Sequence, residues 1–122
     1  MWEIVKSFRF EAAHTLSGTT LGADAQQVHG HSFRAEVALR GTPDAKTGMV
    51  KDFGAIDAAL ADVRRTLDHR MLNKIAGLEQ PTLETLARYI FERLRPLGHV
   101  ARVTVHRDSC GESCSYFGEE RR

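Results

Sequence analysis

The sequence has little of several residue types that mark specialised classes of protein. Its 122 residues include two cysteines, three prolines and one tryptophan. Two cysteines are too few for the disulfide framework of a small secreted domain. Cys110 and Cys114 are separated by three residues and have no second pair, which is a weak signal for zinc. We expect both to be free thiols of structural or incidental importance, with a redox or catalytic role as the alternative.

Long apolar runs and an excess of one charge are also lacking. No run approaches the ~20 apolar residues of a membrane-spanning helix. The opening residues, Met1-Trp2-Glu3-Ile4, lack the basic-then-apolar pattern of a signal peptide. The formal net charge of +1 gives no broad electrostatic attraction to nucleic acid or to a membrane surface. We therefore expect a cytoplasmic protein that folds as one domain over residues 1–122, with no nucleic-acid or membrane partner.

What the sequence does have is hydrophobic alternation in several separate segments. Apolar and polar residues alternate with a period of two, which is typical of strands with one buried face. The predicted strands are residues 2–11, 32–40, 100–106 and 115–117. Short connections between consecutive strands favour antiparallel pairing.

Two other segments change to the helical period. Apolar residues recur at helical spacing over residues 55–67. A second helix is predicted to begin at Thr82, a residue type favoured as an N-cap, and to end at Pro96 and Gly98. The order strand, strand, helix, helix, strand, strand predicts an α+β fold, with two helices on one face of a four-stranded antiparallel sheet. The uncovered face and edges favour oligomerisation.

Three of the six histidines are placed where they can converge. His29 and His31 flank Gly30 at the start of the second strand, and residues i and i+2 of an extended segment project to the same side. His14 follows the first strand, so a hairpin of the two strands brings it beside the other two histidines. Three neutral imidazoles with an open fourth position are the arrangement of a catalytic zinc site. The alternative is three separate polar histidines at strand ends.

Several segments then resemble, in order and spacing, the 6-pyruvoyltetrahydropterin and 6-carboxytetrahydropterin synthases. The resemblance extends from about residue 8 to residue 119, and the carboxy branch, which serves 7-deazapurine (queuosine-type) synthesis, is the closer one. The matching segments are Phe10-Glu11-Ala12-Ala13-His14, His29-Gly30-His31-Ser32-Phe33, Val50-Lys51-Asp52-Phe53, Leu67-Asp68-His69-Arg70-Met71-Leu72-Asn73, Pro81-Thr82-Leu83-Glu84-Thr85-Leu86-Ala87, and the close from Asp108-Ser109-Cys110 to Tyr116-Phe117-Gly118-Glu119.

The resemblance implies the tunnelling fold (T-fold) of that family, with the element order ββααββ. Subunits of such proteins form a barrel, and two trimers stack into a homohexamer with active sites between subunits. The resemblance also implies that His14, His29 and His31 hold Zn²⁺, and that the partner is a small-molecule pterin, dihydroneopterin triphosphate. Zinc in such enzymes is a Lewis acid that acidifies neighbouring C–H and O–H groups.

The resemblance further implies roles for acidic residues. In such enzymes a cysteine base is tuned by an Asp–His pair, which Asp68 and His69 match. A carboxylate early in the last hairpin clamps the amino-pyrimidine edge of the pterin, and Asp108 stands there, one methylene shorter than the family's Glu. Thr82 and Glu84 lie near the clamp, and a carboxylate can accept two adjacent N–H donors at once. The alternatives are a surface residue that stabilises the helix dipole for Glu84 and an ordinary helix-end residue for Asp68.

The family's cysteine is missing from this sequence. The carboxy branch carries it four residues before the first histidine of the H-x-H motif, where this chain has Ala25, and the biopterin branch six residues before, where it has Ala23. Loss of a general base costs ~10²–10⁴-fold in rate unless another group substitutes. Asp24, in the same loop, is the nearest acidic candidate, and the alternative for it is a solvent-facing loop carboxylate. A branch of the family replaces the cysteine with a glutamate and cleaves the side chain instead. Cys110 is a more distant candidate.

Three functions remain open from the sequence. The first is a 6-carboxytetrahydropterin synthase-like lyase with a substitute base. The second is retro-aldol cleavage of a dihydropterin side chain. The third is a pterin-binding protein without synthase activity, because Ala25 replaces the cysteine.

Overall fold

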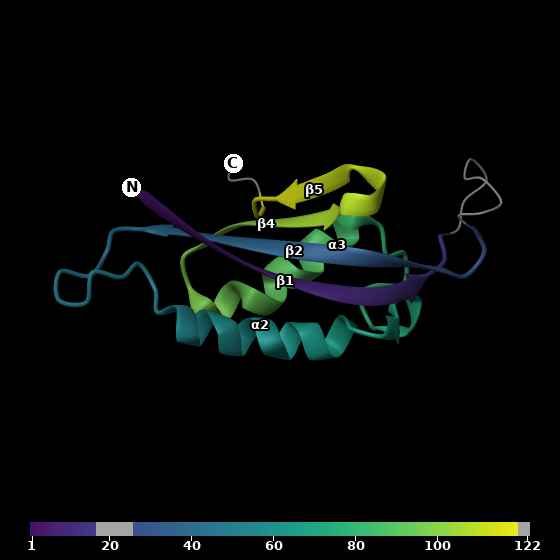
Figure 1. Ribbon diagram of the computed structural model, residues 1–122, viewed down its shortest axis with the longest axis horizontal. Coiled ribbons are helices and arrows are strands. Elements are labelled where there is room, and N and C mark those ends of the chain that lie inside the picture. Colours follow the sequence, from purple (N-terminus) through teal and green to yellow (C-terminus); the bar gives the residue numbers. More distant parts are fainter. Residues whose placement is uncertain (17–25, 120–122) are drawn as a thin grey trace.

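The computed structural model describes residues 1–16 and 26–119. Figure 1 shows one long, twisted sheet with helices on one side. The elements are β1 (Trp2–His14), β2 (His29–Gly41), α2 (Phe53–Leu67), β3 (Arg70–Met71), α3 (Leu83–Leu94), β4 (Val100–Arg107) and β5 (Glu112–Tyr116), with 3₁₀ turns at Leu72–Lys74, Arg95–Leu97 and Asp108–Cys110. The order of the strands across the sheet is β3-β1-β2-β4-β5.

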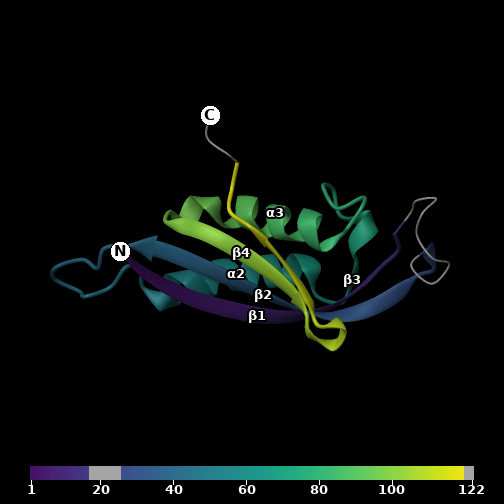
Figure 2. The ribbon, with the colours of Figure 1, turned by 90° about the horizontal axis from the view of Figure 1, so that it is seen from above.

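The predicted α+β class and the placement of the helices are confirmed, and the strand count changes. Helix α2 packs on β1, and α3 packs on β4 and β5, so both helices lie on one side of the sheet (Figure 2). The prediction of four antiparallel strands is corrected by β3, which pairs parallel to β1 at Ala12 and Ala13. A strand of two residues is too short to produce a period in the sequence.

The β1–β2 hairpin is longer at its histidine end than the predicted strands. The pairing is continuous from Trp2 opposite Gly41 to His14 opposite His29. Alternation of apolar residues ends before the strands do, because the last inward positions are histidines rather than hydrophobic residues. The hairpin therefore carries His14, His29 and nearby residues beyond the apolar core on the same ladder of hydrogen bonds.

The core lies between the sheet and the two helices. Phe10 and Phe33 stack across the hairpin with ring centroids 5.0 Å apart. Thr82 caps α3 as predicted, because its Oγ1 accepts a hydrogen bond from Thr85 N at 3.2 Å. Buried apolar side chains of both helices complete the core: Ile56, Leu60, Val63 and Leu67 from α2, and Leu83, Leu86, Ala87, Ile90, Phe91 and Leu94 from α3.

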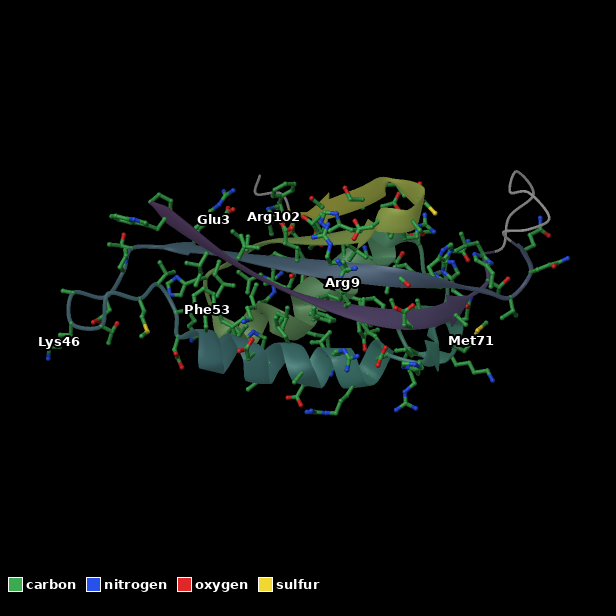
Figure 3. All side chains as sticks on the ribbon, in the orientation of Figure 1. Glu3, Arg9, Lys46, Phe53, Met71 and Arg102 are labelled. Carbon is green, nitrogen blue, oxygen red and sulfur yellow. The ribbon has the colours of Figure 1, made fainter. Side chains whose placement is uncertain are left out.

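The other face of the sheet is polar. Arg102 bonds through Nη1 to Glu36 Oε2 at 2.8 Å and through Nη2 to Glu3 Oε1 at 3.4 Å. Figure 3 shows Glu3 and Arg102 on the side of the sheet away from α2. Within the described ranges, no helix has the length and apolar character needed to cross a membrane.

Candidate metal centre and adjoining cavities

His14, His29 and His31 converge at the end of the β1–β2 hairpin, on the helix side of the sheet. One ligand nitrogen from each ring lies within 4.8 Å of the others. The Nε2 atoms of His14 and His29 are 3.0 Å apart, and the ring centroid of His31 is 5.0 Å from that of His14. His14 is the most buried of the three, at 1% exposed. The sequence prediction of convergence is therefore met by the geometry.

The outer nitrogens of two of these rings face backbone carbonyls. His14 Nδ1 lies 3.2 Å from the carbonyl oxygen of Pro81, and His29 Nδ1 lies 2.8 Å from that of Gln27. A carbonyl oxygen can only accept, so we infer that each Nδ1 carries the proton and each Nε2 carries a lone pair. His31 Nε2 is buried and has no partner in the described part of the chain.

These three nitrogens fit a metal ion. Two lone pairs facing each other at 3.0 Å repel, and a buried unpaired nitrogen costs free energy. A cation bound by all three nitrogens would remove both penalties. His14, His29 and His31 could therefore hold a metal, with a set of imidazole ligands that suits Zn²⁺.

The surroundings keep the buried histidines neutral. The pKa of His14 is lowered to about 4, mainly by burial; the hydrogen bond to the Pro81 carbonyl raises it, and the neighbouring His29, His31 and Arg107 lower it. Burial also lowers the pKa of His31, again with Arg107 nearby. Both rings are thus unprotonated at neutral pH, which is the form that binds a metal.

Asp68 and His69 form a fixed pair at the end of α2. Asp68 Oδ1 accepts from Glu11 N at 2.9 Å, and Oδ2 lies 3.0 Å from His69 Nδ1 and 3.1 Å from Arg64 Nη2. The backbone N–H of Glu11 contributes most to lowering the pKa of Asp68, followed by His69 and Arg64. The Asp68 carboxylate is therefore ionised and holds one nitrogen of the imidazole.

The His69 backbone is unusual for a residue with a side chain. Its φ is 58°, in the left-handed region that residues other than glycine rarely adopt. The conformation is supported by a 2.6 Å hydrogen bond from His69 N to the Glu11 carbonyl oxygen. It presents the ring at the edge of the sheet, with the side chain 77% exposed. Strained backbone that the surroundings fix in this way is common at functional sites.

A cavity of about 510 Å³ joins this pair to the histidine cluster. Both His31 and His69 line it, together with Glu11, Ala12, Ala13, Gly30, Ser32, Arg70 and Met71. The structure thus brings one predicted metal ligand, His31, and one member of the predicted pair, His69, to the same cavity.

A second cavity, of about 370 Å³, contains the other predicted binding residues. Thr82 and Glu84, at the start of α3, line it. The β4–β5 hairpin supplies further lining residues, which include two charged residues that sequence reasoning missed, Arg107 and Glu112, as well as Cys114. Arg107 Nη2 lies 2.5 Å from Glu112 Oε1. The signal for Arg107 was present in the alternation of β4, because Val103 and Val105 face the core and residue 107 continues that face.

Asp108 does not line the cavity that contains Thr82 and Glu84. It begins the 3₁₀ turn after β4, and Arg34 holds its carboxylate through Nε at 3.0 Å and Nη2 at 3.1 Å. Arg34 also lowers the pKa of Asp108. Arg34 pairs with His106 in the sheet, one residue out of phase with the inward-facing Phe33, so this ion pair lies on the polar face.

Three residues bear on the question of a substitute base: Asp24, Cys110 and Cys114. Asp24, like Ala23 and Ala25, lies outside the described residues. Cys110 is exposed in the turn that contains Asp108. Cys114 is half-buried, and its pKa is raised by burial and by the Glu84 carboxylate, which disfavours a reactive thiolate.

Comparison with known proteins identifies relatives of nearly full length. The sequence profile of 6-pyruvoyl tetrahydropterin synthase matches residues 3–119. The chain is 39% identical to 6-carboxy-5,6,7,8-tetrahydropterin synthase of Synechocystis, over 96% of this chain and 94% of that protein. It is 37% identical to dihydroneopterin monophosphate aldolase of Pyrococcus furiosus, over 75% of this chain and 74% of that protein.

Solved structures show the same fold. The 6-pyruvoyl tetrahydropterin synthase of Caenorhabditis elegans superposes with a TM-score of 0.83 at 27% identity, covering 97% of this chain and 96% of that one. An uncharacterised protein of Wolinella succinogenes superposes with a TM-score of 0.76 at 19% identity, covering 97% and 98%. The predicted T-fold is therefore confirmed.

Proposed function

The chain belongs to the 6-pyruvoyl tetrahydropterin synthase family, and from this we propose that it is a zinc-dependent lyase acting on dihydroneopterin triphosphate or a related pterin. The observation that carries the proposal is the convergence of His14, His29 and His31, whose ligand nitrogens lie within 4.8 Å of one another. The name of the Synechocystis relative supports a 6-carboxytetrahydropterin synthase-like reaction as the first candidate.

The three histidines would hold the zinc ion through their inward nitrogens. When bound, zinc supplies Lewis acidity, which lowers the barrier to removing protons next to an oxygen that it binds. The chain itself contributes the carbonyls of Pro81 and Gln27, which fix two of the rings. Hydrogen bonds from the outer ring nitrogen to a carbonyl orient metal-binding histidines and raise their basicity.

Asp68 and His69 would move protons on the substrate side chain. The carboxylate holds Nδ1 of the imidazole at 3.0 Å, which leaves Nε2 to face the substrate. An ionised carboxylate behind a histidine stabilises the protonated ring and fixes its orientation, as in other general acid–base pairs. The shared cavity with His31 supports this role.

Thr82 and Glu84 would bind the pterin ring. Glu84 is exposed in the first turn of α3 and lines the second cavity. Its carboxylate can accept two hydrogen bonds from the amino-pyrimidine edge. For the missing cysteine, Asp24 remains our candidate base, since Cys114 is disfavoured as a thiolate by Glu84 and burial. Asp108, predicted as the pterin clamp, does not line this cavity, and its carboxylate is bonded to Arg34.

We also propose that the site is completed between subunits of a homohexamer, a dimer of trimers. His69 stands exposed at the edge strand side of the sheet. Trp2, Met49 and Phe53 are 56%, 48% and 46% exposed and line an apolar cavity of about 310 Å³ at the other end of the molecule. Exposed apolar residues grouped in this way are typical of contact surfaces.

A second candidate function is retro-aldol cleavage of a dihydropterin side chain. The observation that favours it is the 37% identity to the Pyrococcus aldolase. The same metal ligands and Asp–His pair would serve it, so the difference lies in which bond is broken. A pterin-binding protein without turnover is the third outcome.

The test is to incubate zinc-loaded protein with dihydroneopterin triphosphate and, separately, with dihydroneopterin monophosphate, and to identify products by mass spectrometry. A carboxy- or pyruvoyl-pterin supports the first candidate, and a hydroxymethyl-pterin supports the second. Tight pterin binding without any product leaves the third. Failure to bind either compound would overturn the proposal. An Asp24→Asn variant with unchanged turnover would exclude Asp24 as the base.

A further inference from the structure

Arg107 is a largely buried cation that the proposed function does not yet use. It is the last residue of β4, on the face that Val103 and Val105 present to the helices. Its side chain is 17% exposed. Long cationic side chains are seldom placed at the end of an apolar face unless they have partners. The environment of this guanidinium therefore bears on what the second cavity binds.

The guanidinium is incompletely paired. Nη2 bonds to Glu112 Oε1, its neighbour across the β4–β5 pairing. Nε is buried and has no partner in the part of the chain that the structure describes. An ordinary cross-strand ion pair would account for the contact with Glu112. It does not account for the buried Nε–H, which has no acceptor among the described residues and therefore costs free energy.

The cavity that Arg107 lines contains both hydrogen-bond donors and acceptors. Glu84 and Glu112 supply carboxylate oxygens, which accept, and Arg107 supplies N–H groups, which donate. A ligand that matches this wall needs N–H donors next to an oxygen acceptor on one edge of a flat ring. A 2-amino-4-oxo pyrimidine ring, as in a pterin, has this arrangement: the 2-amino group and N3–H donate, and the oxygen at C4 accepts.

We propose that Arg107 donates a hydrogen bond to the C4 oxygen of the pterin while Glu84 accepts from its amino-pyrimidine edge. Arg107 is then the residue that selects a 4-oxo ring over a 4-amino ring. The inference rests on the proposed function, since it assumes that a pterin occupies this cavity. A 4-amino group would direct N–H donors at the guanidinium, and two donors facing each other cannot bond.

The test compares two fluorescent ligands, pterin and 2,4-diaminopteridine, at a pH where both are neutral. Dissociation constants are measured by fluorescence titration of the zinc-loaded wild-type protein and of Arg107→Met, which keeps the length of the side chain and removes its donors. We expect the wild type to prefer pterin by about 10-fold or more. The preference should fall to near unity in Arg107→Met, mainly through weaker binding of pterin.

Two further variants separate this role from a structural one. Arg107→Lys keeps a donor and should keep part of the preference. Arg88→Met removes an arginine from the exposed side of α3 and should leave both constants unchanged. Thermal unfolding and zinc content of each variant show whether the fold and the metal site are intact.

The outcomes are distinct for the inference and for the proposed function. If Arg107→Met weakens the binding of both ligands equally, or weakens the binding of neither, the role of Arg107 is overturned while pterin binding stays in place. Equal dissociation constants of the wild-type protein for the two ligands would also overturn the role of Arg107. A wild type that binds neither ligand overturns the proposed function, and with it the premise on which the role of Arg107 rests.

Discussion

The Nε2 atoms of His14 and His29 lie 3.0 Å apart, with no proton from either ring available to bridge them. Each outer nitrogen is held by a backbone carbonyl, so the two inner nitrogens are both acceptors. Only a shared cation or an added proton makes this contact favourable. The pair therefore links the conformation of the hairpin end to what binds there.

The first prediction concerns metal content. Wild-type protein prepared with zinc should contain about one zinc ion per chain, and His29→Ala should lose it, because two imidazoles without a third bind zinc much more weakly. Inductively coupled plasma mass spectrometry of dialysed protein measures this. His99→Asn is the matched control, since His99 is exposed and asparagine tolerates its φ of 64°. A zinc content that is unchanged in His29→Ala would contradict the site.

The second prediction concerns Asp68 in turnover. Asp68→Asn should lower kcat by about 10²-fold or more with a smaller effect on KM, because the neutral amide no longer stabilises a protonated His69. Steady-state kinetics on whichever pterin phosphate is turned over provide the measurement. Asp62→Asn, on the exposed side of α2, is the control. Equal kcat values for Asp68→Asn and wild type would remove the pair from the mechanism.

The third prediction concerns the pH dependence of stability. The pKa of Asp68 is lowered in the folded state, first by the Glu11 N–H, so ionised Asp68 stabilises the fold. This contribution is fully present above the ordinary pKa near 4 and is lost as the pH falls through the lower folded-state pKa. Asp68→Asn should remove it.

Urea unfolding of metal-free protein between pH 6 and pH 3 tests this directly. The difference in free energy of unfolding between wild type and Asp68→Asn should shrink as the solution becomes more acidic. If the difference in free energy of unfolding stays constant across this range, the charge of the Asp68 carboxylate does not contribute to stability.

The fourth prediction concerns the boundary between core and site. Phe33 is 1% exposed, stacks on Phe10, and lies with its ring centroid 5.7 Å from that of His31. Phe33→Ala should destabilise the fold by about 3–5 kcal/mol and also weaken zinc binding, since the cavity releases the neighbouring imidazole. Chemical unfolding and a competitive zinc titration measure the two effects. Phe117→Ala, at a 64% exposed position, should change neither.

The sequence allowed prediction of the features that repeat. Alternation located the long strands, and the i, i+2 spacing of His29 and His31 predicted that these two histidines project to the same side. Thr82 was predicted as a cap from its residue type and position, and its hydroxyl does cap α3. Strand alternation and helix capping depend on local sequence, so they can be predicted from one segment without its tertiary contacts.

Other features depend on contacts that no local pattern contains. Strand β3 is defined by the pairing of Arg70 and Met71 with Ala12 and Ala13, which lie far away in the sequence. Asp108 was predicted as the pterin clamp because a carboxylate stands at that place in the family, whereas the alternation of β4 directs residue 107 inward. The 3₁₀ turn that begins at Asp108 then directs this residue to Arg34. The residue type favoured Asp108 as the residue in the cavity, but the backbone geometry places its neighbour, Arg107, there.

The unbroken β1–β2 ladder makes the metal site a reporter of strand register. Side chains alternate between the two sides of a sheet, so a slip of one residue would move Phe33 out of the core and turn His31 towards the polar face. The same register therefore places both the histidines and the phenylalanines on the helix side of the sheet. Binding of a metal ion by all three histidines therefore requires the correct register of the β1–β2 hairpin.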